Sequence, residues 1–425
     1  MGDSSDLKEL QSFSFSNVIG LLNKDDFYQS IEKKLHEAES DCYMLAIAIE
    51  DFDVIFNLYG RDITDDMLEK TASILVEWRQ DDTLKGYVDN NVFFILIEDN
   101  DFGDDSLNQF LDAFVEASAP FQIFLHIGVF KISNKFMPVH MICSHASVAL
   151  DHTLAENGNC FAFYNESLTD QKTHKHKVIS ELEDALDKEN FQIYLQSQTD
   201  REDNMIGAEA LVRWDHPEEG ILTPGQFLSI LEEENLVYLI DRYVWELAVS
   251  QLSDWQNTAL KDVYISINIS QKDFYYLDIY DILTKLMDAY HVAPSLLHLE
   301  INEESFVINA NRQIINRLRE YGFKIVIDKF GSGASSIRTI KDIEVDAIKI
   351  DTSFTKEIKF NIRSRIVLET LINMCRRLNM TVMAEGIEDK DDLDFLKCES
   401  CDSFQGYYFD KPMPVEEFQL KYIKE

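Results

Sequence analysis

Seven polar residues, mostly acids and amides, lie at or near the end of a short apolar segment in the C-terminal half of the chain. Carboxylate and amide oxygens from separate strands are the ligands that Mg²⁺, Mn²⁺ and Ca²⁺ require. Carboxylates gathered in one place would repel one another without a cation. A lysine and a glutamate beside such a cation are suited to orient or deprotonate a water molecule. The seven residues are Glu209, Asn268, Glu300, Asp328, Lys349, Glu385 and Gln405.

Each of the seven belongs to a repeating unit, in which a short apolar strand ends on a polar residue and a helical stretch follows. Any one of them alone is better explained as a solvated side chain at a strand end, so only the recurrence indicates a site. Seven units, with an eighth strand at 191–196, are typical of an eight-stranded β/α barrel, whose strand ends converge on one mouth. The predicted strands are 208–212, 263–269, 296–301, 324–328, 347–351, 381–385 and 403–409.

The N-terminal half of the chain, from about residue 21 to 166, has a different pattern. Helical stretches alternate with short apolar strands, which predicts an α/β fold around a small sheet. A polar stretch at 169–177 is a linker or the exposed start of a connecting helix. The predicted helices are 25–38 and 64–78, and the predicted strands are 43–49, 92–97 and 121–130. The resulting segments are a tail (1–17), an α/β domain (18–168), a linker (169–180) and the barrel (181–425).

The chain is strongly acidic, with 77 Asp and Glu against 39 Lys and Arg and a formal net charge of −38. That charge argues against a nucleic-acid polymer and an anionic membrane surface as partners. A small anionic ligand then needs a metal ion or a local cluster of donors. The N-terminus lacks a signal-peptide pattern and the apolar runs are short, which predicts a soluble, cytoplasmic protein without membrane insertion. The six scattered cysteines are expected to be reduced thiols.

The motifs of the C-terminal half resemble those of EAL-domain cyclic-di-GMP phosphodiesterases. Glu209-Ala210-Leu211, within Gly-Ala-Glu-Ala-Leu-Val-Arg-Trp at 207–214, is similar to the signature of that family. The match covers about residues 181–418, with its motifs in order and correctly spaced. The other motifs are Thr-Pro-Gly-Gln-Phe at 223–227, Asn-Ile-Ser at 268–270, Glu-Ile-Asn-Glu at 300–303, Asp-Lys-Phe-Gly at 328–331, Lys-Ile-Asp at 349–351, Ala-Glu-Gly-Ile-Glu at 384–388 and Gln-Gly-Tyr at 405–407.

This resemblance implies a barrel that holds two Mg²⁺ or Mn²⁺ ions and linearises cyclic-di-GMP to pGpG; a single ion, or none, is the alternative. A protein partner is also expected, and a homodimer is left open. The metal ligands that the resemblance implies are Glu209, Asn268, Glu300 and Asp328. The residues implied to position or activate water are Lys349 and Glu385, supported by Gln405. The implied ligand contacts are Gln196 on a guanine, Arg213 on a phosphate, and Glu209 and Leu211 of the tripeptide.

Lys329 is the departure from the family pattern with the largest consequence. The family normally has two aspartates before Phe-Gly, and here the second is a lysine. An ammonium has three donors and no acceptor, so it cannot bind a cation, and we expect it to lie where the second ion would. Because in-line displacement on phosphate uses two metals, hydrolysis is expected to be impaired while binding survives. The alternative is that the lysine turns to solvent and a neighbour replaces it as ligand.

Two smaller departures concern backbone segments near the mouth. The family usually has Gly-Tyr-Ser-Ser where this chain has Gly-Ala-Ser-Ser at 333–336, in a loop that often couples dimerisation to the active site. That coupling is therefore in doubt. Ser197 stands where a proline usually follows Gln196, which is expected to loosen the backbone.

The N-terminal half resembles GGDEF-domain diguanylate cyclases over about residues 18–164. The signature itself is lost, because Asp-Asn-Asn-Val-Phe at 89–93 stands where Gly-Gly-Asp-Glu-Phe is expected. Two glycines and the catalytic glutamate are missing, and Ala48 replaces a metal aspartate, which leaves Glu50 alone. We therefore expect no cyclase activity and predict a tight hairpin turn at 89–91. The segments of this chain that carry the resemblance are 22–24, 50–52, 59–60, Asp65, 146–150 and 157–159.

Three classes of function are compatible with these motifs. An effector would bind cyclic-di-GMP without appreciable turnover, an enzyme would hydrolyse it despite Lys329, and an interaction module would bind no dinucleotide. The retained site residues argue against the module. Lys329 favours the effector, whereas the retained Lys349 and Glu385 favour the enzyme. We rank the effector first, the phosphodiesterase second and the module third.

Overall fold

The computed structural model describes residues 21–79, 83–89, 91–154, 156–330, 344–352, 354 and 361–423. The chain forms two compact units, Met1–His176 and Lys177–Glu425, and each is described by itself. The Gly-Ala-Ser-Ser segment at 333–336 lies outside the described residues. Within the described ranges, no helix is both long and apolar enough to cross a lipid bilayer.

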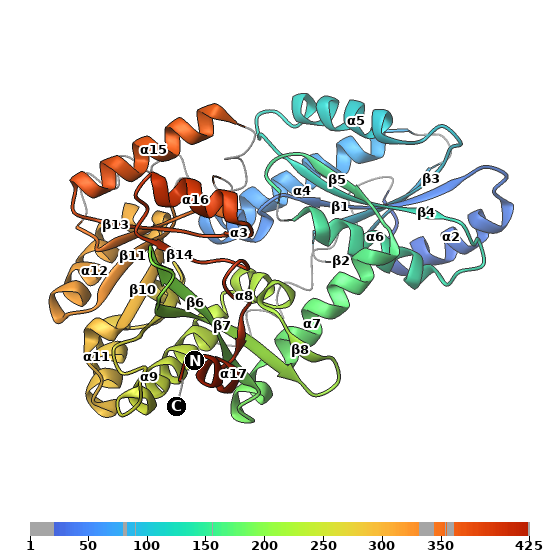
Figure 1. Ribbon diagram of the computed structural model, residues 1–425. Helices are drawn as coiled ribbons and strands as arrows, with labels where there is room; N and C mark the ends of the chain where they lie inside the picture. Colours follow the sequence, from blue (N-terminus) through green and yellow to red (C-terminus); the bar gives the residue numbers. More distant parts are fainter. Residues whose placement is uncertain are drawn as a thin grey trace. The chain divides into compact units, whose positions relative to one another are not determined.

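The first unit is a three-layer α/β sandwich. Its strands are β1 (Cys42–Ile49), β2 (Thr83–Asp89), β3 (Val92–Glu98), β4 (Leu125–Ile132) and β5 (Cys160–Phe163), and its helices are α2 (Lys24–Glu37), α3 (Phe52–Tyr59), α4 (Arg61–Glu77), α5 (Asp104–Ala117) and α6 (Val139–Thr153). The sheet has the order β2-β3-β1-β4-β5. Helices α4 and α5 cover one face and α2 and α6 the other (Figure 1). The central strand β1 is buried along its whole length because its side chains alternate between the two cores.

Two predictions for this unit can be compared directly with the structure. The strand predicted from residue 121 begins instead at Leu125, because its partner β1 ends at Ile49, which pairs with Leu125. The tight turn predicted at 89–91 includes residue 90, which lies outside the described residues; on either side of it, β2 and β3 pair antiparallel up to Asp89 and Val92, and Asn91 has a φ of 68°. Asparagine tolerates that left-handed conformation better than most residues.

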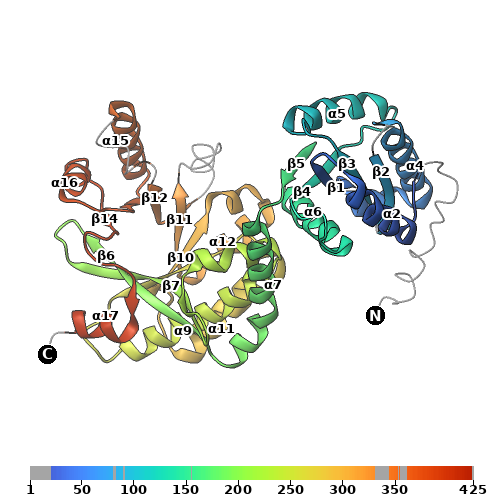
Figure 2. The ribbon, with the colours of Figure 1, turned by 90° about the vertical axis from the view of Figure 1, so that its right-hand side faces the viewer.

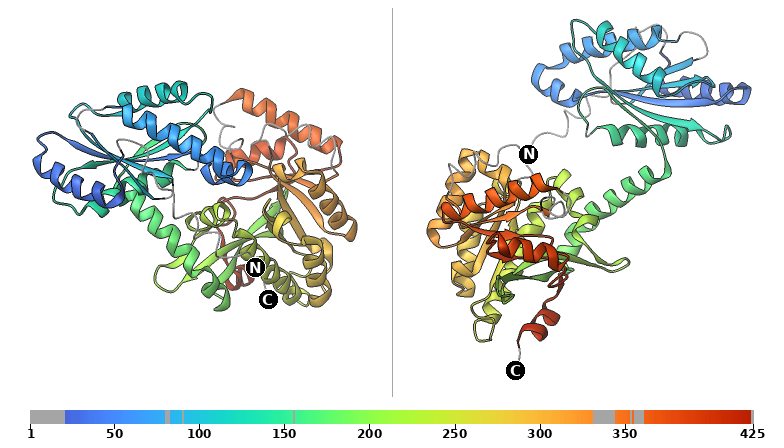
Figure 3. Two further views of the ribbon diagram at one scale, coloured as in Figure 1. Left: turned by 180° about the vertical axis from the view of Figure 1, so that it is seen from behind. Right: turned by 45° about the horizontal axis from the view of Figure 1, so that its top comes forward.

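The second unit is an eight-stranded barrel with helices outside it (Figure 1). Its wall consists of β6 (Phe191–Asp200), β7 (Met205–His216), β9 (Tyr264–Ile269), β10 (Leu297–Asn302), β11 (Lys324–Phe330), β12 (Ala347–Ile350), β13 (Thr381–Ala384) and β14 (Ser403–Phe404). The ring closes through the β6–β7 pairing, and Figure 3 shows it from two further directions. The predicted architecture, an α/β sandwich followed by a barrel, is confirmed. Further elements are β8 (Gly220–Leu222), β15 (Met413–Pro414), α8 (Leu228–Glu233), α9 (Val237–Trp255), α10 (Asp273–Tyr276), α11 (Ile279–Tyr290), α12 (Asn309–Tyr321), α15 (Ile362–Arg377), α16 (Lys390–Cys398) and α17 (Val415–Tyr422).

The barrel differs from eight equal βα units at its first strand. β6 runs antiparallel to both of its neighbours, β7 and β14. The reason is the connection, because the four residues between Asp200 and Met205 form a hairpin and a parallel pair needs a crossover of a dozen residues or so. Gln196 therefore reaches the site from within its strand, directly opposite Glu209, and not from a strand end.

Alternation along the strands separates the side chains that pack from the side chains that form a site. On β9, Ile265 and Ile267 belong to the core between wall and helices, whereas Ser266 and Asn268 point into the barrel. The parallel register then sets Asn268 beside Glu300 on β10. The same rule on β12 buries Ile348 and Ile350 outside and leaves Lys349 inside.

The polar stretch at 169–177 is helical. It lies inside α7 (Glu166–Asp187), which runs without a break (Figure 2). The second of the two alternatives for this stretch, the exposed start of a connecting helix, describes it better than a flexible linker.

Candidate functional site

The ammonium of Lys349 lies among buried acids inside the barrel. Its Nζ donates to Glu209 Oε2 at 3.0 Å and to Glu300 Oε2 at 2.6 Å, and it lies 2.6 Å from Glu385 Oε1. Lys349 is only 1% exposed. The four residues come from β7, β10, β12 and the end of β13, so the barrel wall brings them together from distant parts of the chain. One cation thus neutralises acids from three strands.

Amide side chains complete the surroundings of Glu209. Asn268 Nδ2 donates to Glu209 Oε1 at 3.2 Å, and Gln405 Nε2 donates to Glu209 Oε2 at 2.7 Å. Gln405 Nε2 also donates to Gln196 Oε1 at 3.0 Å. Six of the seven strand-end residues are therefore joined to one another through hydrogen bonds and ion pairs with Glu209 or Lys349, and Gln196 joins them through Gln405. Their chemical roles stay predictions.

The seventh residue, Asp328, lies at a bulge in β11. The pairing of β11 with β12 shifts register between Ile327 and Phe330. Asp328 is buried and adds to the negative field at Lys349, whereas Lys329 is exposed and has a left-handed φ of 49°. Bulges commonly re-aim side chains next to active sites. The expected position of the Lys329 ammonium, at the place of a second ion, stays a prediction; the ammonium that is buried among the acids is that of Lys349.

The predicted ligand contacts on β7 share one face of the strand. Leu211 follows Glu209 and lies opposite Tyr194 on β6, and Arg213 follows Leu211 on the same side. The guanidinium of Arg213 stands over the Tyr194 ring, 5.1 Å from its centroid, and donates to the carbonyl of Val212 at 2.8 Å. Arg213 is thus a nearly buried cation two strand repeats away from Glu209.

Burial and mutual repulsion set the protonation of the acids. Burial by itself would lower the pKa of Lys349, but the carboxylates, Glu209 first among them, raise it well above its ordinary value. Burial, and then the Glu209 carboxylate, raise the pKa of Glu300 to about 8. Burial would also raise the pKa of Glu209, but the Lys349 charge lowers it instead. These surroundings therefore favour the protonated form of Glu300 and the ionised form of Glu209.

Sequence reasoning missed one residue of this cluster. Gln198 is fully buried on β6, and its Nε2 lies 2.9 Å from Gln405 Oε1, 3.2 Å from Ser266 Oγ and 3.4 Å from Glu300 Oε1. The predicted strand ended at 196, two residues too early for this position. Gln198 comes two residues after Gln196, so both side chains lie on the same face of the strand; this spacing was the signal available in the sequence.

The oxygen donors inside the barrel are of the chemical type that a hard cation binds. The acids that act on Lys349 are Glu209, Glu300, Asp328 and Glu385, an excess of negative charge that a divalent cation would offset. In the described ranges, no three His, Cys, Asp or Glu side chains are arranged so that they could hold a metal ion between them. Because the ammonium already supplies the positive charge, a metal ion would have to displace it from at least one carboxylate.

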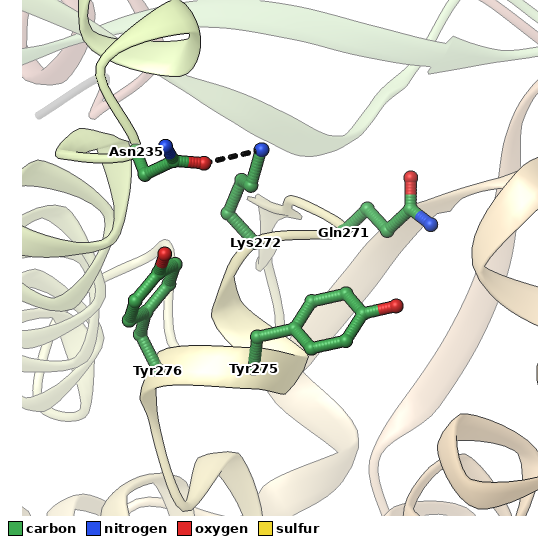
Figure 4. Close-up of a pocket in the computed structure, with 5 residues that line it drawn as sticks. All are labelled: Asn235, Gln271, Lys272, Tyr275 and Tyr276. Atoms are coloured by element: carbon green, nitrogen blue, oxygen red, sulfur yellow. Dashed lines mark hydrogen bonds between the residues drawn. The ribbon is translucent and has the colours of Figure 1, made fainter. Parts of the chain in front are cut away.

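A pocket of about 490 Å³ follows the end of β9. It combines tyrosine rings with two amides and an ammonium, and the Lys272 ammonium donates to the side-chain oxygen of Asn235. Tyr275 and Tyr276 are exposed, so their rings are available for contact. The lining residues are Asn235, Gln271, Lys272, Tyr275 and Tyr276 (Figure 4).

A buried pair of carboxyl groups beside this pocket predicts a pH-dependent stability. Burial raises the pKa of Asp273 to about 6, and burial and then Asp273 raise the pKa of Asp241 well above its ordinary value. Because the folded chain holds these protons more tightly than the unfolded chain, their contribution to stability is lost as pH rises from about 4 through 6. Between pH 5 and pH 8, the wild-type chain should therefore lose about 1–2 kcal/mol more of its unfolding free energy than Asp273→Asn.

Denaturant unfolding at both pH values measures this effect. Asp254→Asn, which removes an exposed carboxylate from α9, is the matched control for net charge. The same pH dependence in wild type and Asp273→Asn would show that the pair does not hold a proton.

Gly406 allows a close backbone approach beside the site. A Cβ at this position would lie 2.2 Å from the carbonyl oxygen and 2.3 Å from the nitrogen of Ile387, whose N–H donates to Gln405 O at 3.1 Å. Gly406→Ala should therefore push these segments apart, lower stability by about 1–3 kcal/mol and displace Gln405. Thermal unfolding measures the loss against Gly225→Ala, where a Cβ meets nothing within 4 Å. Equal stability of both variants would contradict the close approach.

Comparison with known proteins assigns the family. The family model described as "EAL domain" matches residues 179–412, more than half of the chain. The model described as "Diguanylate cyclase, GGDEF domain" matches residues 17–160. The chain therefore belongs to the EAL-domain family, and a GGDEF domain precedes its EAL domain.

Individual relatives extend this finding. The bifunctional diguanylate cyclase/cyclic di-GMP phosphodiesterase MucR of Pseudomonas aeruginosa is 27% identical over 416 residues, which cover 94% of this chain and 60% of MucR. A solved PaMucR phosphodiesterase, in complex with c-di-GMP, is 31% identical with a TM-score of 0.55, over 57% of this chain and 99% of that one. The S helix-GGDEF-EAL part of Vibrio cholerae LapD, 19% identical with a TM-score of 0.53 over 96% of this chain and 98% of that one, supports the fold alone. The chain spans about half to 60% of the length of the curated relatives it matches.

Proposed function

We propose that the barrel is a cyclic-di-GMP receptor with impaired phosphodiesterase activity. The observation that carries this proposal is that Lys329 replaces one metal-binding aspartate, while the other site residues that the family resemblance implies are retained. Residue 329, beside Asp328 at the carboxyl end of β11, is a lysine that cannot ligate a cation. The choice of ligand rests on MucR, which is named a cyclic di-GMP phosphodiesterase and whose solved phosphodiesterase is a c-di-GMP complex.

The oxygen donors of the barrel give the proposal its cation chemistry. A bound Mg²⁺ or Mn²⁺ would polarise the phosphate oxygens and acidify a bound water. Lys349 and Glu385 would orient that water, with Gln405 in support. Because residue 329 offers no oxygen, a second ion would be held weakly or not at all. The proposed ligands of the cation are Glu209, Asn268, Glu300 and Asp328.

The ligand would lie along β6 and β7 toward the pocket at β9. In this pose Gln196 contacts a guanine, Arg213 a phosphate, and Leu211 the apolar part of the ligand. The tyrosine rings and amides of the pocket offer a second place for a planar base, because rings stack on bases and amides pair with their edges.

We infer that the GGDEF domain, at 18–168, is degenerate and makes no cyclic-di-GMP. The turn between β2 and β3 lacks the two glycines, and Val92 occupies the place of the catalytic glutamate. Ala48, directly opposite Val92 in the sheet, offers no oxygen ligand for a metal. A domain of this kind would bind a nucleotide or a partner without chemistry.

Binding and hydrolysis measured side by side test the proposal. Calorimetry with Mn²⁺ should detect cyclic-di-GMP binding by the wild-type chain, while chromatography finds little pGpG. Arg213→Ala should weaken binding by about tenfold, the value of one charge-assisted hydrogen bond. Arg201→Ala, at the exposed turn between β6 and β7, is the control and should bind like wild type. Equal affinity of the two variants would contradict the pose, and absence of binding would contradict the receptor.

A working phosphodiesterase is the second candidate. The exposure of Lys329 favours it, because an exposed lysine can turn its flexible side chain to solvent while a neighbour replaces it as ligand of a second ion. Rapid pGpG formation by the wild-type chain would select this candidate.

A further inference from the structure

The carboxylate of Asp410 is bound by side chains from two separate elements. Ser197 Oγ, on β6, donates to Asp410 Oδ2 at 2.6 Å. Lys421 Nζ and Tyr422 OH, both on α17, donate to the two oxygens of the same carboxylate. Asp410 is 5% exposed and Ser197 is fully buried, so the bond between these two residues is shielded from water. Ser197, which stands where the family usually has a proline, supplies one of the three side-chain donors to this buried carboxylate.

The main chain of the same residue holds a proposed ligand contact. The carbonyl oxygen of Asp410 accepts from Gln196 Nε2 at 2.9 Å. Gln196 Oε1 in turn accepts from Gln405 Nε2 at 3.0 Å, and Gln405 Nε2 also donates to Glu209. A carbonyl and an ionised carboxylate only accept hydrogen bonds. The Asp410 carbonyl at one end and the Glu209 carboxylate at the other therefore fix which side of each amide carries the oxygen.

This fixed direction leaves Gln196 with one N–H and one oxygen lone pair for a ligand, in a set order. Guanine and adenine present different orders of donors and acceptors on their base edges, so an amide that cannot flip discriminates between them. An amide free to flip would accept either base.

We propose that Asp410 is a positioning residue for base discrimination, through which α17 holds the Gln196 amide in the orientation that accepts guanine. This inference rests on the proposed function, because it assumes that Gln196 contacts a base of the ligand. Asp410 acts through its carbonyl and does not itself touch the ligand. The three side-chain donors fix the carboxylate, and the carboxylate fixes the carbonyl of the same residue.

Asp410→Ala tests the proposal against a variant of matched stability. Phe418→Leu weakens the packing of α17, where the buried Phe418 ring stacks on Trp255, but leaves the Asp410 bonds in place. Both variants should unfold at lower temperature than wild type. In calorimetry, only Asp410→Ala should lose about tenfold of the preference for cyclic-di-GMP over cyclic-di-AMP, as expected when one oriented hydrogen bond is lost. Tyr422→Phe removes only one of the three donors to Asp410, so it should lose a smaller part of the preference for cyclic-di-GMP.

A preference that is unchanged in Asp410→Ala, or reduced equally in Phe418→Leu, would overturn the positioning role while leaving the proposed function intact. Failure of the wild-type chain to bind either dinucleotide would overturn the proposed function instead. The positioning role then has a ligand-free readout in the side-chain amide resonances of Gln196. They should shift in Asp410→Ala and not in Phe418→Leu, and identical spectra for the two variants would count against it.

Discussion

Replacing Lys329 by aspartate should accelerate pGpG formation at least about a hundredfold over the wild-type chain. Two metals clamp the attacking and leaving oxygens of an in-line displacement, and this clamp supplies several kcal/mol of transition-state stabilisation. Residue 329 stands next to the buried Asp328 at the carboxyl end of β11, so a carboxylate there adds an oxygen ligand beside the existing ones. Affinity for cyclic-di-GMP should change much less than the rate, because most ligand contacts are untouched.

The backbone favours this substitution. Lys329 has a left-handed φ of 49°, a conformation that aspartate adopts more readily than lysine, so the variant should be at least as stable as wild type. Single-turnover assays with Mn²⁺, read by chromatography, give the rate. Lys261→Asp makes the same charge change on an exposed turn and should leave the rate unaltered. If Lys329→Asp and wild type hydrolyse the ligand equally fast, the receptor interpretation fails and the phosphodiesterase stands.

The barrel was predictable because its evidence repeats along the chain. Each strand that ends near a polar residue is weak evidence by itself, but a parallel register forces the recurring residues onto one side of one ring, as Asn268 and Glu300 illustrate. The hairpin of β6 and β7 broke the repeat and was missed. The predicted strands ended at 196 and began again at 208, which left room for a crossover, whereas the true strands extend toward each other until only four residues connect them.

The contacts within the site were less predictable because they join residues far apart in the chain. Gln198 meets Gln405, and Asp410 meets Ser197, only after the first and last strands of the barrel pair. No spacing in the sequence encodes such a pair. The bulge in β11, beside Lys329, was equally hard to predict, since no spacing in the sequence encodes a one-residue shift of register.

Lys349→Met should destabilise the barrel by about 3–5 kcal/mol in the absence of divalent cations and abolish hydrolysis in the Lys329→Asp background. The ammonium contacts Glu209, Glu300 and Glu385 in a site shielded from water, and removing it leaves the negative charge of these acids buried without compensation. Methionine keeps the length and the apolar stem of the side chain. The loss of stability therefore measures the missing charge and not the effect of a cavity.

Divalent cations separate this explanation from a simple loss of packing. If the ammonium supplies the charge that a metal otherwise supplies, Mn²⁺ should bind more tightly to Lys349→Met than to wild type and should restore most of the lost stability. Thermal unfolding with EDTA and with Mn²⁺ measures both effects. Lys324→Met, at the exposed start of β11, breaks an ion pair with Asp346 and should change stability by less than about 1 kcal/mol under either condition. A Lys349→Met variant that unfolds at the same temperature with and without Mn²⁺ would show that the acids do not bind the cation, and a metal-dependent role for the barrel would have to be given up.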